Sequence, residues 1–253
     1  MQRYDVRTVK IGLCGFTIGI AQYARHFPVV EVQQTFYQPS SEAVMRRWRT
    51  NTPAGMEFTI KAWQLITHTA KSPTYRRLKR TLSERERAEA GAFRPTAIVD
   101  EAWRVTAECS KLLQASAIVF QCPASFKPTA ENVANMQSFF NRMDRPDGVR
   151  LLWEPRGVWP DDVIQSVCSS CDLIHVVDPF VNKTVTQGTI YYRLHGITGS
   201  RHVYSDEELL QLQGMIPPTG DCYVLFNNIP RVADALRFGN LLAEGLCPDG
   251  SQP

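Results

Sequence analysis

Eight short apolar segments recur along the chain, and helical patterns separate most of them. This alternation of strand and helix favours a parallel sheet, and eight such units suit a closed barrel in a chain of this length. We therefore predict an α/β fold, a single (β/α)8 TIM barrel that spans residues 1–253. The predicted strands are Lys10–Thr17, Val29–Phe36, Glu57–Ala62, Ser116–Pro123, Val149–Arg156, Leu173–Pro179, Ile190–Gly196 and Cys222–Asn228.

Helix-start patterns fall between these segments. Thr129 is placed to cap a helix, and Ser205 with Glu208 has the spacing of a capping box. One connection is much longer than usual, the segment 63–97 after the third strand. Because it leaves that strand at its C-terminal end, we expect it to lie over the barrel mouth.

The long connection also carries most of the asymmetry in charge. The net charge is only +3, but residues 71–80 hold five basic side chains and no acidic one. Such a patch is typical of phosphate or nucleic-acid contacts, which we assign to Lys71, Arg76, Arg77, Lys79 and Arg80.

Three aromatic residues, Trp63, Tyr75 and Phe93, lie in the same connection. Aromatic rings interleaved with basic residues suit stacking on bases beside phosphate contacts. The same rings can equally anchor the connection to the barrel, and the sequence leaves both interpretations open.

Composition restricts the class of protein. No apolar run approaches the roughly 18 residues that a membrane span needs, so we expect no membrane association. The first strand begins too early for a signal peptide, and the seven cysteines form no disulfide pattern, so we predict a cytoplasmic protein. Cys168 and Cys171 have redox-pair spacing, but they fall late in a predicted helix, which favours a structural role.

Charged and polar residues occur near the C-terminal ends of the predicted strands. Residues two apart in a strand face the same side, so Glu154 shares a face with Arg156, and Arg193 shares one with His195. Asp178 occupies the matching position in the sixth strand. Barrel cores are normally filled by branched aliphatic residues, so this collection predicts a site at the C-terminal mouth.

The residue types suggest acid/base chemistry. His195 is the expected proton-transfer residue, with Glu154 and Asp178 as general acid and base, or as ligands with it of one divalent metal ion. Lys61 can bind an anion or, if it loses its proton, form a Schiff base; with Glu31 and Glu154 nearby we expect it to stay charged. The phosphate-loop, dinucleotide and serine-hydrolase motifs are absent, so no nicotinamide or nucleotide cofactor is predicted.

Several segments occur in the order typical of one family. EVQQTFYQ, EFTIKAWQLITH, WEPRGVW, HVVDPF, YYRLHGI and CYVLFNN resemble the YecE-like family, a domain of unknown function, over nearly the whole chain. The resemblance implies a TIM barrel related in shape to endonuclease IV and xylose isomerase. Besides Glu154, Asp178 and His195, the mouth residues it implies, which we assign to substrate binding, are Glu31, Thr35, Tyr37, Lys61, His68, Gln121, Arg156, Arg193, Asn227 and Asn228.

The chain departs from the family pattern at a few positions. Gln34 stands where the family usually has Asn, Phe16 where it has Trp, and Gly157 follows Arg156 where the family has His. The missing histidine argues against a mechanism that needs two imidazoles.

Two functions fit the sequence. The first is a hydrolase, lyase or isomerase that acts by acid/base chemistry on an anionic, phosphorylated or nucleic-acid-derived substrate at the barrel mouth. The second is a non-catalytic nucleic-acid-binding module that uses residues 71–80. The partner is accordingly an anionic small molecule or a nucleic acid.

Overall fold

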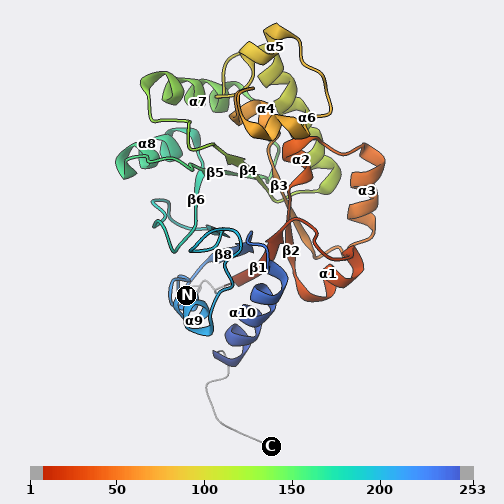
Figure 1. Ribbon diagram of the computed structural model, residues 1–253, viewed down its shortest axis with the longest axis vertical. Helices are drawn as coiled ribbons and strands as arrows, with labels where there is room; N and C mark the ends of the chain where they lie inside the picture. The colour runs from red at the N-terminus through yellow and green to blue at the C-terminus, as the bar shows by residue number, and fades with distance from the viewer. Residues whose placement is uncertain (1–7, 246–253) are drawn as a thin grey trace, which may run out of the picture.

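The sheet is a closed barrel of eight parallel strands in sequence order, as predicted. A computed structural model describes residues 8–245, so the ends of the predicted domain, 1–7 and 246–253, lie outside the described residues. Figure 1 shows the view down the barrel, with the strands enclosed by helices. The strands are β1 (Thr8–Cys14), β2 (Val29–Val32), β3 (Glu57–Lys61), β4 (Ala117–Gln121), β5 (Arg150–Glu154), β6 (Ile174–Val177), β7 (Ile190–Leu194) and β8 (Asp221–Phe226).

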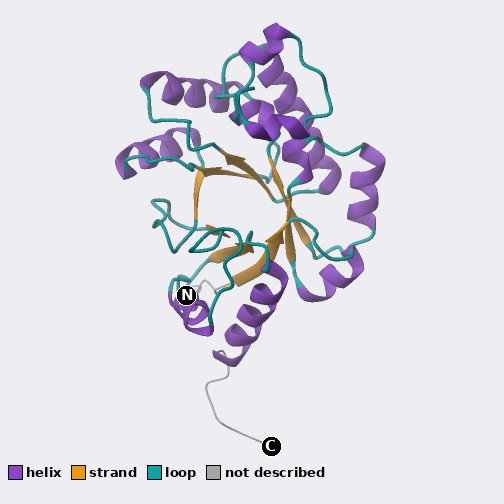
Figure 2. Cartoon of the chain, viewed as in Figure 1, coloured by secondary structure: helices purple, strands orange, loops and turns teal. Residues whose placement is uncertain are grey.

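Helices form the outer layer, as Figure 2 shows. The segment 178–189 between β6 and β7 contains no helix and is the one irregular crossover of the described barrel. The helices are α1 (Ile20–His26), α2 (Gln34–Tyr37), α3 (Glu42–Thr50), α4 (Gln64–Thr67), α5 (Glu84–Glu89), α6 (Ala97–Leu113), α7 (Ala130–Arg142), α8 (Asp161–Cys171), α9 (Asp206–Gly214) and α10 (Arg231–Gly245), with a 3-10 helix, η1 (Pro73–Arg77).

Apolar side chains pack on both faces of the strands. Outward-facing residues such as Phe120 and Trp153 pack in the main core with the surrounding helices, whereas Val119 and Leu152 belong to a smaller cluster inside the barrel. This alternation follows from the two-residue period of a strand. The burial of both faces explains why the strands are such apolar segments.

Most strands end a few residues earlier than predicted. Asp178, His195 and Asn227 lie just beyond the last residues of β6, β7 and β8, and Thr35 lies within α2. Regular pairing ends at these points, although the Asn227 N–H still donates to the Leu194 carbonyl oxygen at 2.8 Å. The polar ends of the predicted strands are therefore the first loop residues at the mouth, where side chains from different strands meet.

The long connection 63–97 is ordered by helices and by its own backbone. It contains α4, η1 and α5, and Ser83 forms a capping box with Glu86 at the start of α5. Gly91 N–H donates to the Leu65 carbonyl at 2.8 Å, which folds the end of the connection back onto α4. Gly91 has φ +82°, and a Cβ there would lie 2.2 Å from the His68 carbonyl oxygen, so this close approach requires glycine.

The aromatic residues of the connection anchor it to the barrel. Phe93 is fully buried and packs against Phe120 and Phe139, and Trp63 is also buried. Tyr75 is partly buried, and its hydroxyl donates to the His68 carbonyl oxygen at 2.7 Å. The base-stacking interpretation is therefore wrong for Trp63 and Phe93, because neither ring has a face open to solvent.

The remaining fold predictions agree with the structure. Thr129 and Ser205 cap α7 and α9 as expected. Cys168 and Cys171 are both buried near the end of α8, and burial raises the pKa of both thiols, that of Cys168 to about 12. Within residues 8–245, no helix has both the length and the apolar character needed to cross a bilayer.

Candidate functional site

Arg193 lies at the centre of the polar layer at the top of the barrel. Its side chain is fully buried, and Nε and Nη2 donate to the two carboxylate oxygens of Glu31 at 3.0 and 2.8 Å. Nη1 donates to Gln121 Oε1 at 2.8 Å and to Glu154 Oε2. One guanidinium thus joins carboxylates from β2 and β5, and this pairing offsets the cost of burying the charges.

Glu31 is enclosed in the same way. The Tyr191 hydroxyl donates to Glu31 Oε2 at 3.0 Å, and the Gln33 amide donates to Oε1. Glu31 and Arg193 are both 0% exposed. The direct substrate contact expected for these two residues does not match their surroundings, because their charged groups are enclosed by protein partners. They form the floor of the site and hold Glu154 in position.

The Glu154 carboxylate connects this floor to the mouth. Its Oε1 lies 2.8 Å from His195 Nε2 and 3.1 Å from Arg156 Nη1. The second ring nitrogen of His195, Nδ1, lies 3.1 Å from the Asn227 side-chain amide nitrogen. Because an amide nitrogen only donates, Nδ1 accepts and Nε2 carries its hydrogen toward Glu154.

The charge of Glu154 is fixed by this environment. Burial alone would raise the pKa of the carboxyl group, but the charge of Arg193 and the hydrogen bond from His195 outweigh burial and hold the pKa well below its usual range. Glu154 is therefore a permanent carboxylate near neutral pH. It can stabilise a positive charge on His195, but it does not supply a proton.

Asp178 connects the loop after β6 to the end of β7. Its Oδ2 accepts from the His195 backbone N–H at 2.8 Å, and its Oδ1 accepts from the Phe180 N–H at 3.1 Å. The side chain is largely buried, with 8% exposed. Asp178 therefore positions the backbone of His195, whatever further role it has.

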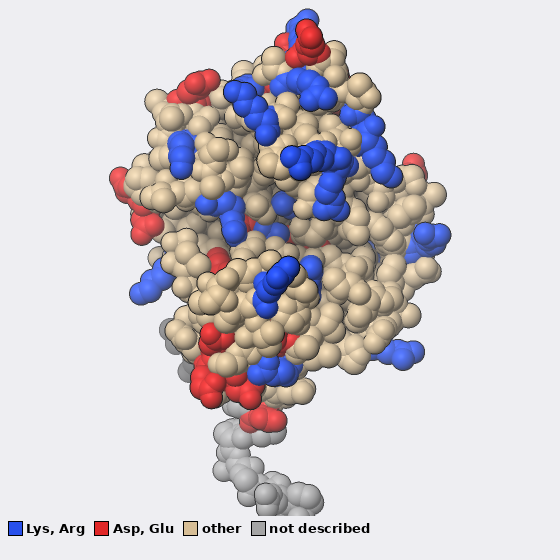
Figure 3. Space-filling model, viewed as in Figure 1, with Lys and Arg blue, Asp and Glu red and all other residues tan. Residues whose placement is uncertain are grey.

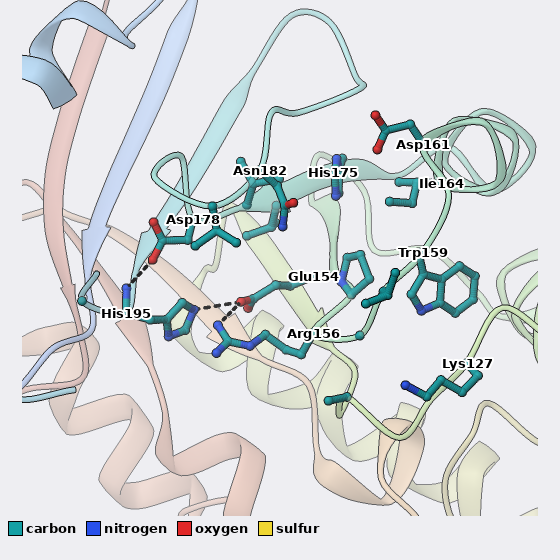
Figure 4. A pocket seen from close by; sticks show the side chains of 18 residues that line it. Lys127, Glu154, Arg156, Trp159, Asp161, Ile164, His175, Asp178, Asn182 and His195 are labelled. Carbon is teal, nitrogen blue, oxygen red and sulfur yellow. Dashed lines mark hydrogen bonds and ion pairs between the residues drawn. The ribbon is translucent and has the colours of Figure 1, made fainter. Parts of the chain in front are cut away.

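A pocket of about 500 Å³ opens beside these residues. Figure 4 shows His195 and Arg156 converging on the Glu154 carboxylate, with Asp178 held against the His195 backbone. The three side chains expected to carry chemistry thus border one pocket. The rest of the lining comprises Ala124, Lys127, Pro155, Arg156, Gly157, Val158, Trp159, Asp161, Ile164, His175, Val176, Val177, Val181, Asn182 and Gly196.

The pocket continues past β6 to α8, and the sequence analysis missed this part. His175 of β6 alternates with the inward-facing residues Ile174 and Val176 and lines the pocket together with Asp161 of α8. Burial lowers the pKa of His175 to about 4, so its ring is neutral. In the sequence, the one feature that sets this region apart is the missing helical pattern between the sixth and seventh strands.

Lys61, at the end of β3, lies in the same barrel mouth. Its side chain is 5% exposed, and Nζ lies 3.6 Å from the centroid of the Phe36 ring. Among residues 8–245, none accepts a hydrogen bond from this amine or forms an ion pair with it. We expected Glu31 and Glu154 to keep Lys61 charged, but Arg193 binds both carboxylates. Burial and the charge of Arg193 outweigh the opposing effect of Glu31 and Glu154 and lower the pKa of Lys61 from 10.5 to about 7.

Of three other expected binding residues, Thr35 and His68 lie near Lys61, and Tyr37 packs against Phe36. Thr35 is buried, and its hydroxyl contacts the Lys61 carbonyl oxygen at 2.7 Å, which fixes the end of β3. His68 is buried, and burial followed by the charge of Lys61 lowers its pKa to about 3. Tyr37 is partly exposed, and the Arg77 guanidinium stacks on its ring at 3.4 Å.

The two asparagines after β8 have different environments. Asn227 is partly exposed and contacts His195. Asn228 is fully buried, where its Nδ2 donates to the His202 carbonyl oxygen at 2.9 Å and to Asp234 Oδ2 at 2.6 Å. Asn228 therefore belongs to the packing beneath the mouth, and the substrate contact expected for it does not match this position.

The candidate metal ligands do not form a metal-binding set. No group of three or more histidine, cysteine, aspartate or glutamate side chains is placed to hold a metal ion among the described residues. Both oxygens of Glu154 are engaged by cationic side chains or by His195, and Asp178 binds two backbone N–H groups. The donor set at the pocket therefore does not fit a divalent ion.

The basic residues of segment 71–80 differ in solvent exposure and in whether they form ion pairs. Arg80 forms ion pairs with Glu101, at 2.5 Å, and with Glu86, so its charge is already neutralised. Lys71, Arg76, Arg77 and Lys79 are exposed. Figure 3 shows lysine and arginine side chains gathered over this part of the mouth face and around a central hollow, with acidic side chains gathered near α9.

Comparisons with known proteins agree with this architecture. A DUF72 family protein from Enterococcus faecalis V583 has a TM-score of 0.68 at 21% identity, covering 96% of this chain and 99% of that one. A DUF72 family protein from Thermotoga maritima MSB8 has a TM-score of 0.66 at 18% identity, covering 93% and 99%. A D-tagatose 3-epimerase-like protein has a TM-score of 0.56 at 15% identity, covering 94% and 97%.

No curated protein sequence matches the chain. At these identities the structural likeness shows the fold alone, a TIM barrel. The sequence profile described as "Protein of unknown function DUF72" matches residues 17–252. The chain therefore belongs to the DUF72 family.

Proposed function

We propose that the protein is an enzyme that uses acid/base chemistry on an anionic, phosphorylated or nucleic-acid-derived substrate at the C-terminal mouth. The observation that carries the proposal is the pocket of about 500 Å³ bordered by Glu154, Asp178, His195 and Arg156. An ionised carboxylate, an imidazole and a guanidinium that converge on one pocket are typical of a catalytic site. The reaction type, hydrolase, lyase or isomerase, stays open.

Arg156 is the residue best placed to hold the anionic group. Its side chain is 38% exposed and uses Nη1 to contact Glu154, which leaves other N–H groups of the guanidinium available. Lys127 lines the same pocket and adds a second positive charge. A planar guanidinium binds carboxylate or phosphate through two parallel hydrogen bonds, and the lysine contributes as a point charge.

His195 is the expected proton-transfer group, and its surroundings define how it works. Its Nε2–H faces Glu154, whose carboxylate stabilises the ring when it takes up a proton. Nδ1, the basic nitrogen, has one hydrogen-bond partner within the described part of the chain, the Asn227 amide at 3.1 Å. A substrate hydroxyl that displaces this amide meets the lone pair directly, and Asp178 keeps the backbone of His195 fixed meanwhile.

The proteins of similar structure are compatible with an enzyme, but they do not identify a substrate for this chain. They include a D-tagatose 3-epimerase-like protein and a xylose isomerase domain containing protein from Salmonella typhimurium LT2, at 15% and 14% identity. Within the DUF72 family, we propose that the chain is YecE-like, because its motifs resemble those of that group. A shared fold does not fix a reaction, so the pocket and its side chains support the proposal.

The proposal is tested by incubating the protein with a metabolite extract and following every compound by mass spectrometry. We expect anionic compounds to be consumed by the wild type and left intact by His195→Asn. Arg156→Gln should weaken the same activity, whereas Arg76→Gln, outside the pocket, serves as the matched control. The proposal fails if no compound changes, or if His195→Asn consumes the same compounds as the wild type.

A second candidate is the non-catalytic nucleic-acid-binding module, which the exposed basic side chains of segment 71–80 favour. It predicts single-stranded nucleic-acid affinity that falls steeply as salt rises. Neutralising Arg76, Arg77 and Lys79 together should reduce the slope of log affinity against log salt by about 2. Neutralising Arg104 and Lys111, exposed on α6, is the control. An unchanged slope in the triple variant would exclude this use of the segment.

A further inference from the structure

Lys61 is a buried lysine whose amine rests on the Phe36 ring but has no hydrogen-bond acceptor and no ion-pair partner among residues 8–245. We propose that Lys61 is a reactive amine that forms an imine with the carbonyl group of an aldehyde or ketone entering the barrel mouth. We take this carbonyl compound to be anionic, and that part of the inference rests on the proposed function. The amine chemistry itself rests on the surroundings of Lys61.

The Lys61 amine has neither a hydrogen-bond acceptor nor an ion-pair partner among the described residues. A buried lysine with a structural role normally has an acceptor, because burying an unpaired charge is costly. Even Lys10, which is only partly buried in the same barrel, has such partners: its Nζ lies 2.5 Å from Glu57 and 3.3 Å from the Tyr223 hydroxyl. Lys61 has no such acceptor among residues 8–245, although only 5% of it is exposed.

Charged and titratable groups around the amine act on it in opposite directions. Burial and the positive charge of Arg193 lower the pKa of Lys61, whereas Glu31 and Glu154 raise it but are hydrogen-bonded to Arg193 and form no ion pair with Lys61. His68 is neutral and adds no negative charge. The groups that face Lys61 from the neighbouring elements are Cys14, Glu31, His68, Glu154 and Arg193.

The consequence is a large population of neutral amine. With a pKa of about 7, half of the Lys61 amines carry no proton near neutral pH. For an amine with a pKa of 10.5, only on the order of one in 10³ is neutral under the same conditions. Only the neutral amine has the lone pair needed to attack a carbonyl carbon.

The chemical step is balanced. The nitrogen lone pair of Lys61 forms a bond to the carbonyl carbon, and the carbonyl oxygen takes up a proton from the nitrogen. The resulting carbinolamine loses water, which breaks the carbon–oxygen bond and leaves a carbon–nitrogen double bond. One amine and one carbonyl compound thus give one imine and one water, without an oxidant or a reductant.

The experiment traps this imine in the folded wild-type protein. Glyoxylate is the probe, because it is an anionic aldehyde and is small enough for a nearly enclosed amine, of which 5% is exposed. Cyanoborohydride delivers hydride to the imine carbon and makes the adduct a permanent secondary amine. Peptide mapping by mass spectrometry then compares Lys61 with the six lysines that act as internal controls, Lys10, Lys71, Lys79, Lys111, Lys127 and Lys183.

We expect Lys61 to be modified at least 10-fold faster than the exposed Lys71 and Lys79 near neutral pH, and the label to be lost from that peptide in Lys61→Met. Modification of Lys71 and Lys79 with Lys61 left unmodified overturns the inference. This comparison within the wild type holds even if the variant does not fold.

The two proposals fail separately. His195→Asn leaves the amine in place, so Lys61 should still be labelled. Labelling of Lys61 without any turnover of metabolites would remove the acid/base proposal alone, and turnover with Lys61 unlabelled would remove the imine alone.

Discussion

Replacing Lys61 by methionine should stabilise the protein, which is unusual for a change at a polar buried position. Methionine has a similar length and no charge, so it fills the space against Phe36 without the cost of burying an ammonium group. The reason is the missing partner: among the described residues, no carboxylate or other acceptor compensates this charge. A residue kept at the expense of stability is typical of a functional site.

The magnitude follows from the pKa of Lys61. In the unfolded chain it has the ordinary value of 10.5, and in the folded protein burial and Arg193 lower it to about 7. The difference is equivalent to about 5 kcal/mol, at 1.36 kcal/mol for each pKa unit. Because the folded pKa is the lower one, the cost is fully present below about pH 7 and disappears as the pH rises toward 10.5.

The assay is urea unfolding of the wild type and Lys61→Met over this pH range, with the difference in unfolding free energy as the readout. Lys10→Met is the matched control, since burial opposes the charge of Lys10 but its bonds to Glu57 and Tyr223 raise its pKa. Lys10→Met should therefore destabilise the protein, most strongly below pH 10.5.

The reasoning about Lys61 is refuted by either of two results. One is that Lys61→Met destabilises the protein near neutral pH. The other is that its advantage is the same at every pH, because a constant gain would come from packing and not from a relieved charge.

Two other predictions concern the floor of the site and the long connection. Arg193→Met should destabilise the protein by about 3–5 kcal/mol in urea unfolding, because it leaves the buried Glu31 without its cation and Glu154 Oε2 without its donor; a loss below about 1 kcal/mol would contradict this. Gly91→Ala should cost more than about 1 kcal/mol and speed proteolysis within 63–97, because its φ is +82° and its Cβ would lie 2.2 Å from a carbonyl oxygen. Gly55→Ala, which meets no atom within 4 Å, should stay within about 0.5 kcal/mol, and equal effects at the two glycines would rule out the close approach as the cause.

Much of the fold could be predicted from the sequence because apolar strands alternate with helical patterns throughout. The polar positions at the strand ends also identified the mouth, since the two-residue period of a strand fixes which side chains face inward. Glu154, Asp178 and His195 border one pocket for this reason. The segment between β6 and β7 was harder to judge, because a missing helix leaves no positive pattern.

The interactions within the site could not be predicted from residue types alone. Glu31, Glu154 and Lys61 were expected to pair, but pairing depends on which cation reaches the carboxylates from across the barrel. Arg193 of β7 reaches both, and this single contact leaves Lys61 without an acceptor. Arg80 is a similar case, because its carboxylate partners are supplied by residues that surround it only after folding.

The measurement that tests the central claim most directly is steady-state kinetics on whichever compound the wild type consumes from a metabolite extract. We predict that His195→Asn lowers kcat by roughly 10²–10⁴-fold, the usual contribution of a positioned acid or base. Arg156→Gln should lower kcat/KM by roughly 10–100-fold through weaker binding of the anion, because it removes a charged hydrogen-bond donor. If both variants turn the compound over like the wild type, the pocket beside Glu154 is not the active site.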